Sequence, residues 1–184
     1  MKIFFWIAMA AAALSAVPAS AQIGQVEQTA ILKAHNTERA ATGSPAEAAL
    51  TWSAGLAAYA QAWAQTLATT YDNLVHRDAS TNSADYTVNN TVYPSQSLGE
   101  NIFGSTAADD GTLGATAVTD WISEKANYNN GTGCAAGQTC GHYTQVVWRN
   151  TSVVGCGKAT SKTGWTYVVC NYYTPGNYIG QTPY

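Results

Sequence analysis

The 184-residue sequence predicts an α+β fold in which helices come first and strands come last. Three observations support this class. Apolar residues recur at helical spacing through much of the first two thirds, β-branched and aromatic residues gather in the last third, and strands and helices do not strictly alternate. A doubly wound parallel sheet needs that alternation, so we expect helices and strands to form separate layers.

Three segments have the composition and spacing of helices: 26–41, 53–69 and 114–128. The first is rich in Ala, Glu, Lys and Arg, and the residues 43–45 (Gly-Ser-Pro) end it. The second begins at Ser53, a favourable N-cap residue, and has one apolar face. In the third, Trp121 and Glu124 stand three residues apart and therefore share a helix face.

Three later segments are predicted to be antiparallel strands: 143–148, 153–158 and 165–173. They are β-branched and aromatic, and turn-forming residues at 150–152 and 161–164 separate them. The polar stretch 71–97 is expected to be a long loop, and regular structure resumes at 98–103. A loop of this length inside a domain is usually functional or mobile.

The first 21 residues have the features of a secretory signal peptide. Lys2 gives a positive start, residues 3–17 are almost wholly apolar or small, and Ala19-Ser20-Ala21 precedes the expected cleavage point. The alternative is a membrane anchor, but the apolar run is shorter than the ~20 residues that a bilayer needs. We therefore expect residues 22–184 to form one exported domain with no integral membrane segment, extracellular, or periplasmic or cell-surface if the source is bacterial.

The charge balance argues against a nucleic-acid partner. The chain carries a formal net charge of −3, and loss of Lys2 with the leader makes it one unit more negative. Nucleic-acid phosphates require a basic surface, which this composition does not supply.

All four cysteines lie in the last third, and an even number in an exported chain predicts two disulfides. Of the three possible connectivities we favour one. Pairing Cys134 with Cys140 would close a tight Gly-containing loop, and pairing Cys156 with Cys170 would link neighbouring strands. The alternative, a metal site of four cysteines, lacks the paired two-residue gaps of zinc ribbons.

Candidate functional residues stand far apart in the chain. His76 and His142 lie in loop-like, polar sequence, Glu100 follows a glycine, and Glu124 lies on a predicted helix. Each alone has an ordinary structural explanation, and sequence spacing cannot bring the four together. Only a fold could do so.

Two long sequence strings are highly specific: CGHYTQVVWR at 140–149 and YVVCNYYTPGN at 167–177. The strings GENI at 99–102 and AHN at 34–36, with Arg39, accompany them. Together they resemble the CAP superfamily, which includes cysteine-rich secretory proteins, antigen 5 and pathogenesis-related class 1 proteins (SCP-like extracellular domains). The resemblance extends over roughly residues 28–184.

The resemblance implies a three-layer α–β–α sandwich with a small antiparallel sheet and a central cleft. The family's cleft tetrad maps onto His76, Glu100, Glu124 and His142, which makes these the candidate catalytic residues. Some family members bind zinc or another divalent cation, and the corresponding ligands are His76 and His142. His35 resembles a buried structural histidine of the family and is left out of the site.

One departure concerns the cysteines, because plant relatives carry six. The third bridge would fall near Asn73 and residues 159–160, where no cysteine stands. The segment that follows His76 is therefore expected to be less tethered.

The resemblance also implies a function, the binding and sequestration of sterols or other lipids. The family's lipid-binding loop corresponds to residues 77–98, with these apolar or aromatic residues available: Tyr86, Val88, Val92, Tyr93 and Pro94. One alternative is a hydrolase or peptidase that uses the tetrad, although no Ser or Cys nucleophile is evident. Further alternatives are a structural or regulatory metal module, and a host–microbe interaction protein of defence or virulence without catalysis. No pattern indicates an oligomeric state.

Overall fold

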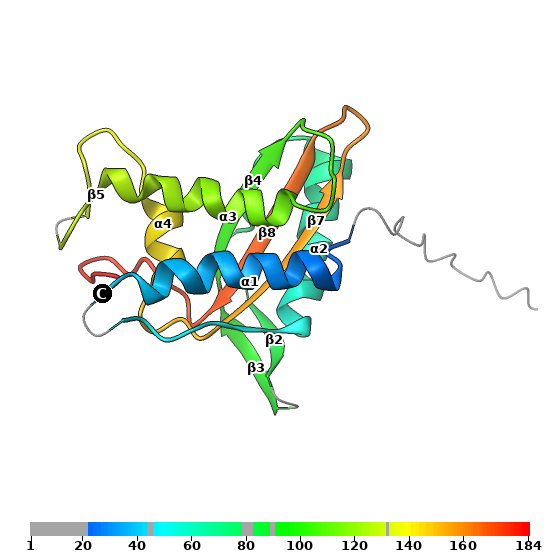
Figure 1. The fold of residues 1–184 in the computed structure, drawn as a ribbon. Coiled ribbons are helices and arrows are strands. Elements are labelled where there is room, and N and C mark those ends of the chain that lie inside the picture. The colour runs from blue at the N-terminus through cyan, green and yellow to red at the C-terminus, as the bar shows by residue number, and fades with distance from the viewer. Residues whose placement is uncertain (1–21, 44–45, 79–82, 89–90, 132) are drawn as a thin grey trace, which may run out of the picture.

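The structure is a computed structural model that describes residues 22–43, 46–78, 83–88, 91–131 and 133–184; for 83–88 and 91–96 it describes the backbone alone. The central sheet has four strands in the order β1-β7-β8-β4 (Figure 1). Their bounds are Thr51–Trp52 for β1, Val153–Thr160 for β7, Thr166–Tyr173 for β8 and Gly99–Ser105 for β4. β7 and β4 both run antiparallel to β8, and β1 runs parallel to β7. The predicted antiparallel sheet is thus a mixed one because of a two-residue edge strand.

Helices cover both faces of this sheet, which confirms the three-layer sandwich. Helices α1 (Gln25–Ala40) and α3 (Leu113–Ser123) pack together on one face, and α2 (Ala54–Thr66) packs on β7 and β8 from the other (Figure 1). Side chains of β8 alternate between the two cores, as a strand's period of two requires. Val168 and Tyr172 enter the α1/α3 core, whereas Val169 enters the α2 core.

Glycines of β7 allow the close approach of α2. A Cβ atom on Gly155 would lie 2.3 Å from the backbone nitrogen of Ala57, and one on Gly157 would lie 2.3 Å from Cα of Gln61. A side chain at either position would push α2 away from the sheet, so the packing of this layer depends on both glycines.

Both disulfides of the favoured connectivity are present. Cys156 and Cys170 face each other in the β7–β8 ladder, and Cys134 bonds to Cys140 six residues later. The described residues contain no free cysteine. The alternative four-cysteine metal site is therefore wrong.

The helix predictions need small changes at their ends. After α2 the chain continues as one π-helical turn, η2 (Leu67–Tyr71), and after α3 as a 3₁₀ turn, η3 (Glu124–Asn127). Glu124 accordingly stands where the regular helix ends, and its carboxylate can reach the next element.

The predicted strand at 143–148 is wrong, because Gly141–Val146 forms a short helix, α4. Its polar ends are satisfied from other parts of the fold. The carboxylate of Glu124 accepts the backbone N–H groups of His142 and Tyr143 at the first turn. The guanidinium of the buried Arg39 donates to the carbonyl oxygens of Val146 (3.0 Å) and Trp148 (2.8 Å) at the other end. These tertiary contacts override the β-preference of Val and Trp.

The predicted long loop at 71–97 is also partly wrong. Its second half contains two antiparallel strands, β2 (Ser83–Val88) and β3 (Thr91–Ser97), and β2 packs against α2. A smaller hairpin joins β5 (Tyr128–Asn129) to β6 (Gly133–Cys134). No helix in the described part of the chain is long and apolar enough to cross a membrane.

Candidate functional site

The first pair of candidate residues joins His76 to the edge strand β4. Nδ1 of His76 lies 3.0 Å from Oε1 of Glu100, which also accepts the backbone N–H of Arg77 at 3.0 Å. The Glu100 side chain is 4% exposed, whereas that of His76 is 56% exposed. An ionised carboxylate can only accept a hydrogen bond, so Nδ1 donates here, and in the neutral imidazole the free lone pair belongs to Nε2.

Both chain neighbours of His76 are held against α2. The indole N–H of Trp63 donates to the carbonyl oxygen of Val75 at 3.0 Å. The guanidinium of Arg77 lies 3.9 Å from the ring centroid of Tyr59 and 4.8 Å from that of Trp63. These contacts fix the main chain on both sides of the imidazole, although His76 belongs to no helix or strand.

A polar contact ties this segment down near the position where plant relatives have a third disulfide. The Asp72 carboxylate accepts hydrogen bonds from the hydroxyls of Thr163 (2.6 Å) and Tyr167 (3.0 Å). The bond from Thr163 is the main reason why the pKa of Asp72 is lowered. Asp72 therefore links the chain before His76 to β8 and the preceding turn, whereas the segment after His76, for which we expect less tethering, begins beyond this contact.

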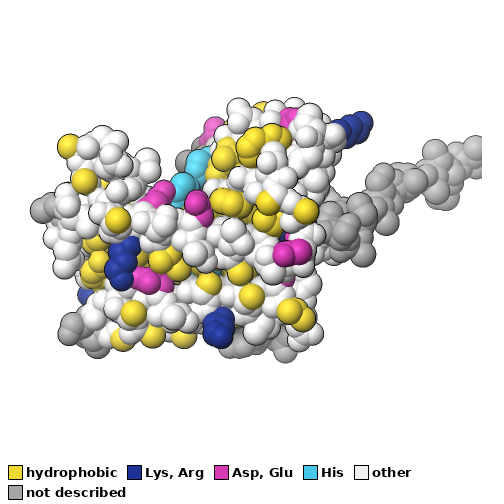
Figure 2. Space-filling view, turned by 45° about the horizontal axis from the view of Figure 1, so that its top comes forward, with side chains coloured by type: hydrophobic (Ala, Val, Ile, Leu, Met, Phe, Trp, Pro, Cys, Tyr) yellow, Lys and Arg dark blue, Asp and Glu magenta, His cyan; other side chains and the backbone are white. Residues whose placement is uncertain are grey.

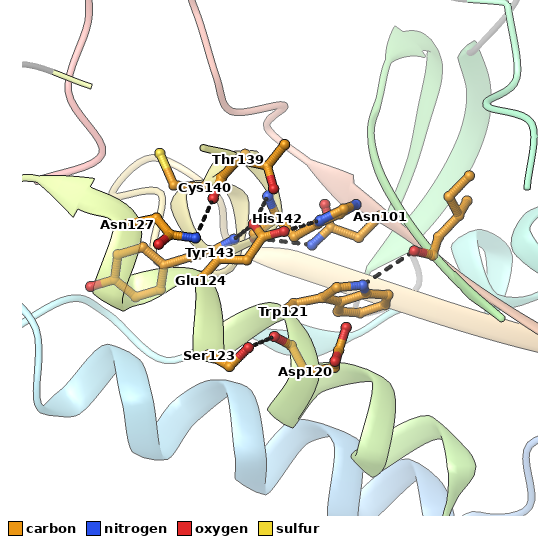
Figure 3. A network of polar contacts seen from close by, with 12 residues as sticks. Asn101, Asp120, Trp121, Ser123, Glu124, Asn127, Thr139, Cys140, His142 and Tyr143 are labelled. Carbon is orange, nitrogen blue, oxygen red and sulfur yellow. Dashed lines mark hydrogen bonds and ion pairs between the residues drawn. The ribbon is translucent and has the colours of Figure 1, made fainter. Parts of the chain in front are cut away.

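The second pair joins η3 to α4 (Figure 3). Nδ1 of His142 lies 2.7 Å from Oε1 of Glu124, and Oε2 of Glu124 accepts the backbone N–H of His142 at 3.0 Å. One carboxylate thus fixes both the ring and the main chain of His142. As in the first pair, Nε2 is the nitrogen of the neutral imidazole that can bind a cation. The His142 side chain is 32% exposed.

Two buried residues, Trp121 and Asn101, contact the ring and the main chain of His142. The indole of Trp121 stacks on the imidazole at 6.2 Å between ring centroids and 21° between planes, and its N–H donates to the carbonyl oxygen of Ile102. The amide of Asn101 donates to the carbonyl oxygen of His142 at 3.1 Å (Figure 3). Sequence reasoning missed Asn101, whose only signal was its place in the GENI string.

Strand β4 connects the two pairs. Glu100 and Asn101 are consecutive, so their side chains leave the strand on opposite sides. Glu100 binds the His76 segment, and Asn101 binds the main chain of His142. The space-filling view shows histidine and acidic side chains together in a hollow on one face (Figure 2).

The arrangement offers at most a two-histidine metal site. Among the described residues, no three His, Cys, Asp or Glu side chains are grouped closely enough to hold an ion. Each glutamate instead accepts a hydrogen bond from Nδ1 of its histidine. Metal-binding histidines usually donate their other ring N–H to a carboxylate in this way. The chemistry of the donor set therefore fits a divalent cation with two protein ligands and open positions for water.

His35 lies apart from the site and is completely buried, as predicted. Its Nδ1 lies 2.9 Å from the carbonyl oxygen of Ile31 and its Nε2 lies 3.0 Å from the hydroxyl of Tyr172. Burial lowers the pKa of His35 to about 4 and raises that of Tyr172. Because Asn101 also donates to the Tyr172 hydroxyl at 3.3 Å, a buried hydrogen-bond network runs from α1 to the main chain of His142.

Two further polar residues contact Glu100 and were missed from the sequence. Asn171 is fully buried and donates to Oε2 of Glu100 at 3.3 Å, and Arg77 donates its backbone N–H to Oε1. Within the described residues, Oδ1 of Asn171 and Nε of Arg77 are the buried side-chain atoms that lack a hydrogen-bond partner. Both therefore belong to residues next to Glu100, where ordered water could satisfy them.

The fold and the disulfides define a small disulfide-bonded α–β–α sandwich domain with paired histidines and glutamates on one face. Residues 32–172 match the model of the CAP family, described as the cysteine-rich secretory protein family. The chain belongs to this family.

Curated relatives place it near the pathogenesis-related class 1 proteins of plants. Pathogenesis-related protein 1B of Nicotiana tabacum is 42% identical over 87% of this chain and 82% of its own length. Pathogenesis-related protein 1 of Arabidopsis thaliana is 39% identical over 91% of this chain and 87% of its own length. The predicted membership in the CAP superfamily is therefore confirmed.

Solved structures share the fold. The structure of BmVAL-1 superposes with a TM-score of 0.69 at 23% identity, covering 91% of this chain and 85% of the other. The crystal structure of NaASP2 with Zn²⁺ gives a TM-score of 0.64 at 21% identity, covering 91% and 89%. At this level of identity the comparisons support the sandwich architecture alone.

Proposed function

We propose that this CAP-family protein is exported and binds a divalent cation, zinc or a similar ion, through Nε2 of His76 and Nε2 of His142. The observation that carries the proposal is the pair of Nδ1–carboxylate hydrogen bonds, at 3.0 and 2.7 Å. Each bond fixes the tautomer in which Nε2 is a lone-pair donor. The description of NaASP2 with Zn²⁺ supports the choice of ion for a protein of the same fold.

With two protein ligands, the cation would keep positions open for water or a small ligand. A bound cation of this kind can polarise a carbonyl group or acidify a water molecule. Glu100 and Glu124 would orient the imidazoles and increase their basicity. The alternative of a hydrolase would use the same residues, and in the described part of the chain neither histidine hydrogen-bonds a Ser or Cys side chain.

Calorimetry with zinc tests the metal site directly. Metal-free protein titrated with zinc should release heat that His76→Ala and His142→Ala each abolish. Glu38→Gln is the control, because Glu38 lies on α1, pairs with Lys125 at 2.8 Å and forms no ion pair with either histidine among the described residues. Unchanged heat in either histidine variant would contradict the proposal.

Sterol or lipid sequestration remains a second proposal that rests on family membership. Its residues in the 77–98 segment, from Tyr86 to Pro94, have side chains outside the described part of the structure. The backbone of β2 packs on α2, whose residues Tyr59 and Trp63 hold the segment around His76, so that hairpin lies near the candidate site. A binding assay with radiolabelled sterol should give saturable uptake, and an absence of uptake would contradict this second proposal.

Two alternatives stay testable by the same variants. A peptidase based on the tetrad predicts an activity that Glu100→Ala and His142→Ala both remove. A defence or virulence role without catalysis predicts an effect on a microbe or host that survives both substitutions.

Export is supported by the leader-like first 21 residues, which lie outside the described part, and by the two disulfides. Intact-mass measurement of the secreted protein should give a single-domain chain that begins at Gln22. A chain that retains Met1 would contradict removal of the leader.

A further inference from the structure

A groove lies at one end of the molecule, separate from the two histidine–glutamate pairs. It has a volume of about 450 Å³ and runs between the β5–β6 hairpin and the C-terminal segment 177–183. Figure 1 shows the C-terminal segment near α4, at the same end as β5. This volume falls within the range of about 300–1,000 Å³ that is usual for ligand sites.

The walls of the groove are held in place before any ligand binds. The disulfide between Cys134 and Cys140 closes one wall. On the other wall, the Asn177 side chain accepts from the hydroxyl of Thr144 at 2.6 Å and donates to the carbonyl oxygen of Gly141 at 2.9 Å. A preformed groove loses little conformational entropy on binding, which favours a ligand that is itself stiff.

No charged side chain lines the groove. Its lining residues include no Asp, Glu, Lys, Arg or His, although the chain as a whole is acidic. The groove is therefore suited to an uncharged ligand, because a charged group would lose its hydration without gaining an opposite charge.

Aromatic rings form part of the surface. The rings of Trp148 and Tyr178 lie 6.2 Å apart between centroids and are tilted by 54°. Trp148 is nearly buried, whereas Tyr178 is 46% exposed and presents its ring to solvent. An apolar ring of a ligand can pack on Tyr178, and the polar edge of the tyrosine remains able to form a hydrogen bond.

Three polar side chains that remain for a ligand can donate hydrogen bonds, and two of them, a tyrosine hydroxyl and a glutamine amide, can also accept. Among the described residues, no hydrogen bond engages the indole N–H of Trp148, the hydroxyl of Tyr178 or the side-chain amide of Gln181. All three residues line the groove. A ligand that combines apolar rings with carbonyl acceptors can therefore pack on the groove and accept a hydrogen bond from each of these three side chains.

We propose that this groove binds a proline-rich peptide segment in the polyproline II conformation. Proline residues have no backbone N–H, so such a segment offers carbonyl acceptors and pyrrolidine rings and no main-chain donor. The polyproline II helix is already extended in solution, and aromatic grooves with donor side chains recognise it in other protein families. An oligosaccharide would present hydroxyl donors as well as acceptors, and a second copy of the chain would bury the groove in a dimer; both are outcomes that the test separates.

The test is a titration of the ¹⁵N-labelled exported protein with acetylated decaproline, followed by NMR. Saturable shifts are expected for the Trp148 indole N–H and for the amides of Tyr178 and Gln181. Tyr178→Ala should weaken binding by about tenfold, the effect of losing one aromatic contact with its hydroxyl. Tyr71→Ala is the matched control, because Tyr71 is equally exposed (48%) and lies outside the groove.

Several results would overturn the proposal. They are a lack of saturable shifts, equal binding of a Gly-Ser decapeptide, and equal weakening by Tyr71→Ala. Binding of cellohexaose but not decaproline at the same amides would assign the groove to a glycan. Shifts that depend on protein concentration alone would assign it to a dimer.

Discussion

Glu124 binds His142 at two points: Oε1 lies 2.7 Å from Nδ1 of the ring, and Oε2 accepts the backbone N–H of the same residue. The carboxylate therefore determines the tautomer of the imidazole and also holds the first turn of α4. Glu100 has the corresponding relation to His76, where the backbone N–H comes from Arg77 instead.

The first prediction concerns this carboxylate. Glu124→Gln keeps the shape of the side chain but removes the charge that orients the His142 ring. Loss of a carboxylate that orients a metal-binding histidine typically weakens metal affinity by about 10–100-fold. We expect a decrease in this range for zinc by calorimetry. Glu38→Gln, with a similarly exposed carboxylate in an ion pair, should leave zinc affinity unchanged. Equal weakening by both substitutions would mean that zinc affinity depends on the net charge of the protein and not on the orientation of the His142 ring.

The second prediction concerns Asn101, which is 1% exposed and donates to both the carbonyl oxygen of His142 and the hydroxyl of Tyr172. Asn101→Ala leaves those two buried acceptors short of a donor. Urea unfolding should show a loss of about 1–3 kcal/mol in the free energy of unfolding, and zinc affinity should decrease as the main chain at His142 loosens. Asn150→Ala, at an exposed position outside both histidine segments, is the control. Wild-type zinc affinity in a folded Asn101→Ala protein would show that the contact supports the fold alone.

The third prediction concerns pH. The pKa of His35 is about 4 in the folded protein and 6.5 in its unperturbed state, because burial disfavours the charged imidazole. Between these values the unfolded chain binds a proton that the folded chain does not, so stability decreases as the pH falls from 6.5 to 4. The full contribution is at most about 3 kcal/mol.

Urea unfolding of the wild type and of His35→Gln at several pH values measures this contribution. The variant should lose less stability over that interval, since it has no histidine to protonate at position 35. An NMR titration of the wild type checks the same point without a substitution. Protonation of His35 near pH 6.5 in the folded protein would contradict the prediction.

The fourth prediction concerns a buried ion cluster away from the site. Nζ of Lys158 lies 2.7 Å from Oε2 of Glu27 and 2.6 Å from Oδ2 of Asp109, and Lys158 is 2% exposed. Burial lowers the pKa of Lys158, but the hydrogen bonds that its ammonium donates to Asp109 and Glu27 outweigh this effect and raise the pKa overall.

Lys158→Met would leave two carboxylates without their cation. Breaking a buried ion pair in this way destabilises a protein by about 3–5 kcal/mol, and chemical denaturation should show a loss of that order. Lys125→Met removes an exposed partner of Glu38 and should change stability by less than about 1 kcal/mol. Equal effects would mean that the buried cluster contributes no more than a surface pair.

The sequence predicted the three long helices because their apolar residues recur at helical spacing, and it predicted the β7–β8 pair from its β-branched and aromatic residues. It failed at α4, whose ends are satisfied by Glu124 and Arg39 from distant parts of the chain. It also failed at the β2–β3 hairpin, although β-forming residues flank Asn89-Asn90 on both sides.

Glu100 and His142 lie in the motif strings, and the family resemblance added His76 and Glu124 by position; local chemistry alone could not have joined the four. The structure adds how each pair is arranged, with Nδ1 bound to a carboxylate, and it adds Asn101, Asn171 and Trp121 as supporting residues. Such contacts depend on the side to which each strand residue points and on the path of the chain between elements. No spacing in the sequence encodes that information.

Diffraction from zinc-soaked crystals at the zinc absorption edge would show whether one cation bridges the two histidines. We expect one anomalous peak at about 2.0–2.1 Å from Nε2 of His76 and from Nε2 of His142, with the remaining ligands water. A peak bound to one histidine only, bound through a carboxylate, or absent from the site would contradict this expectation.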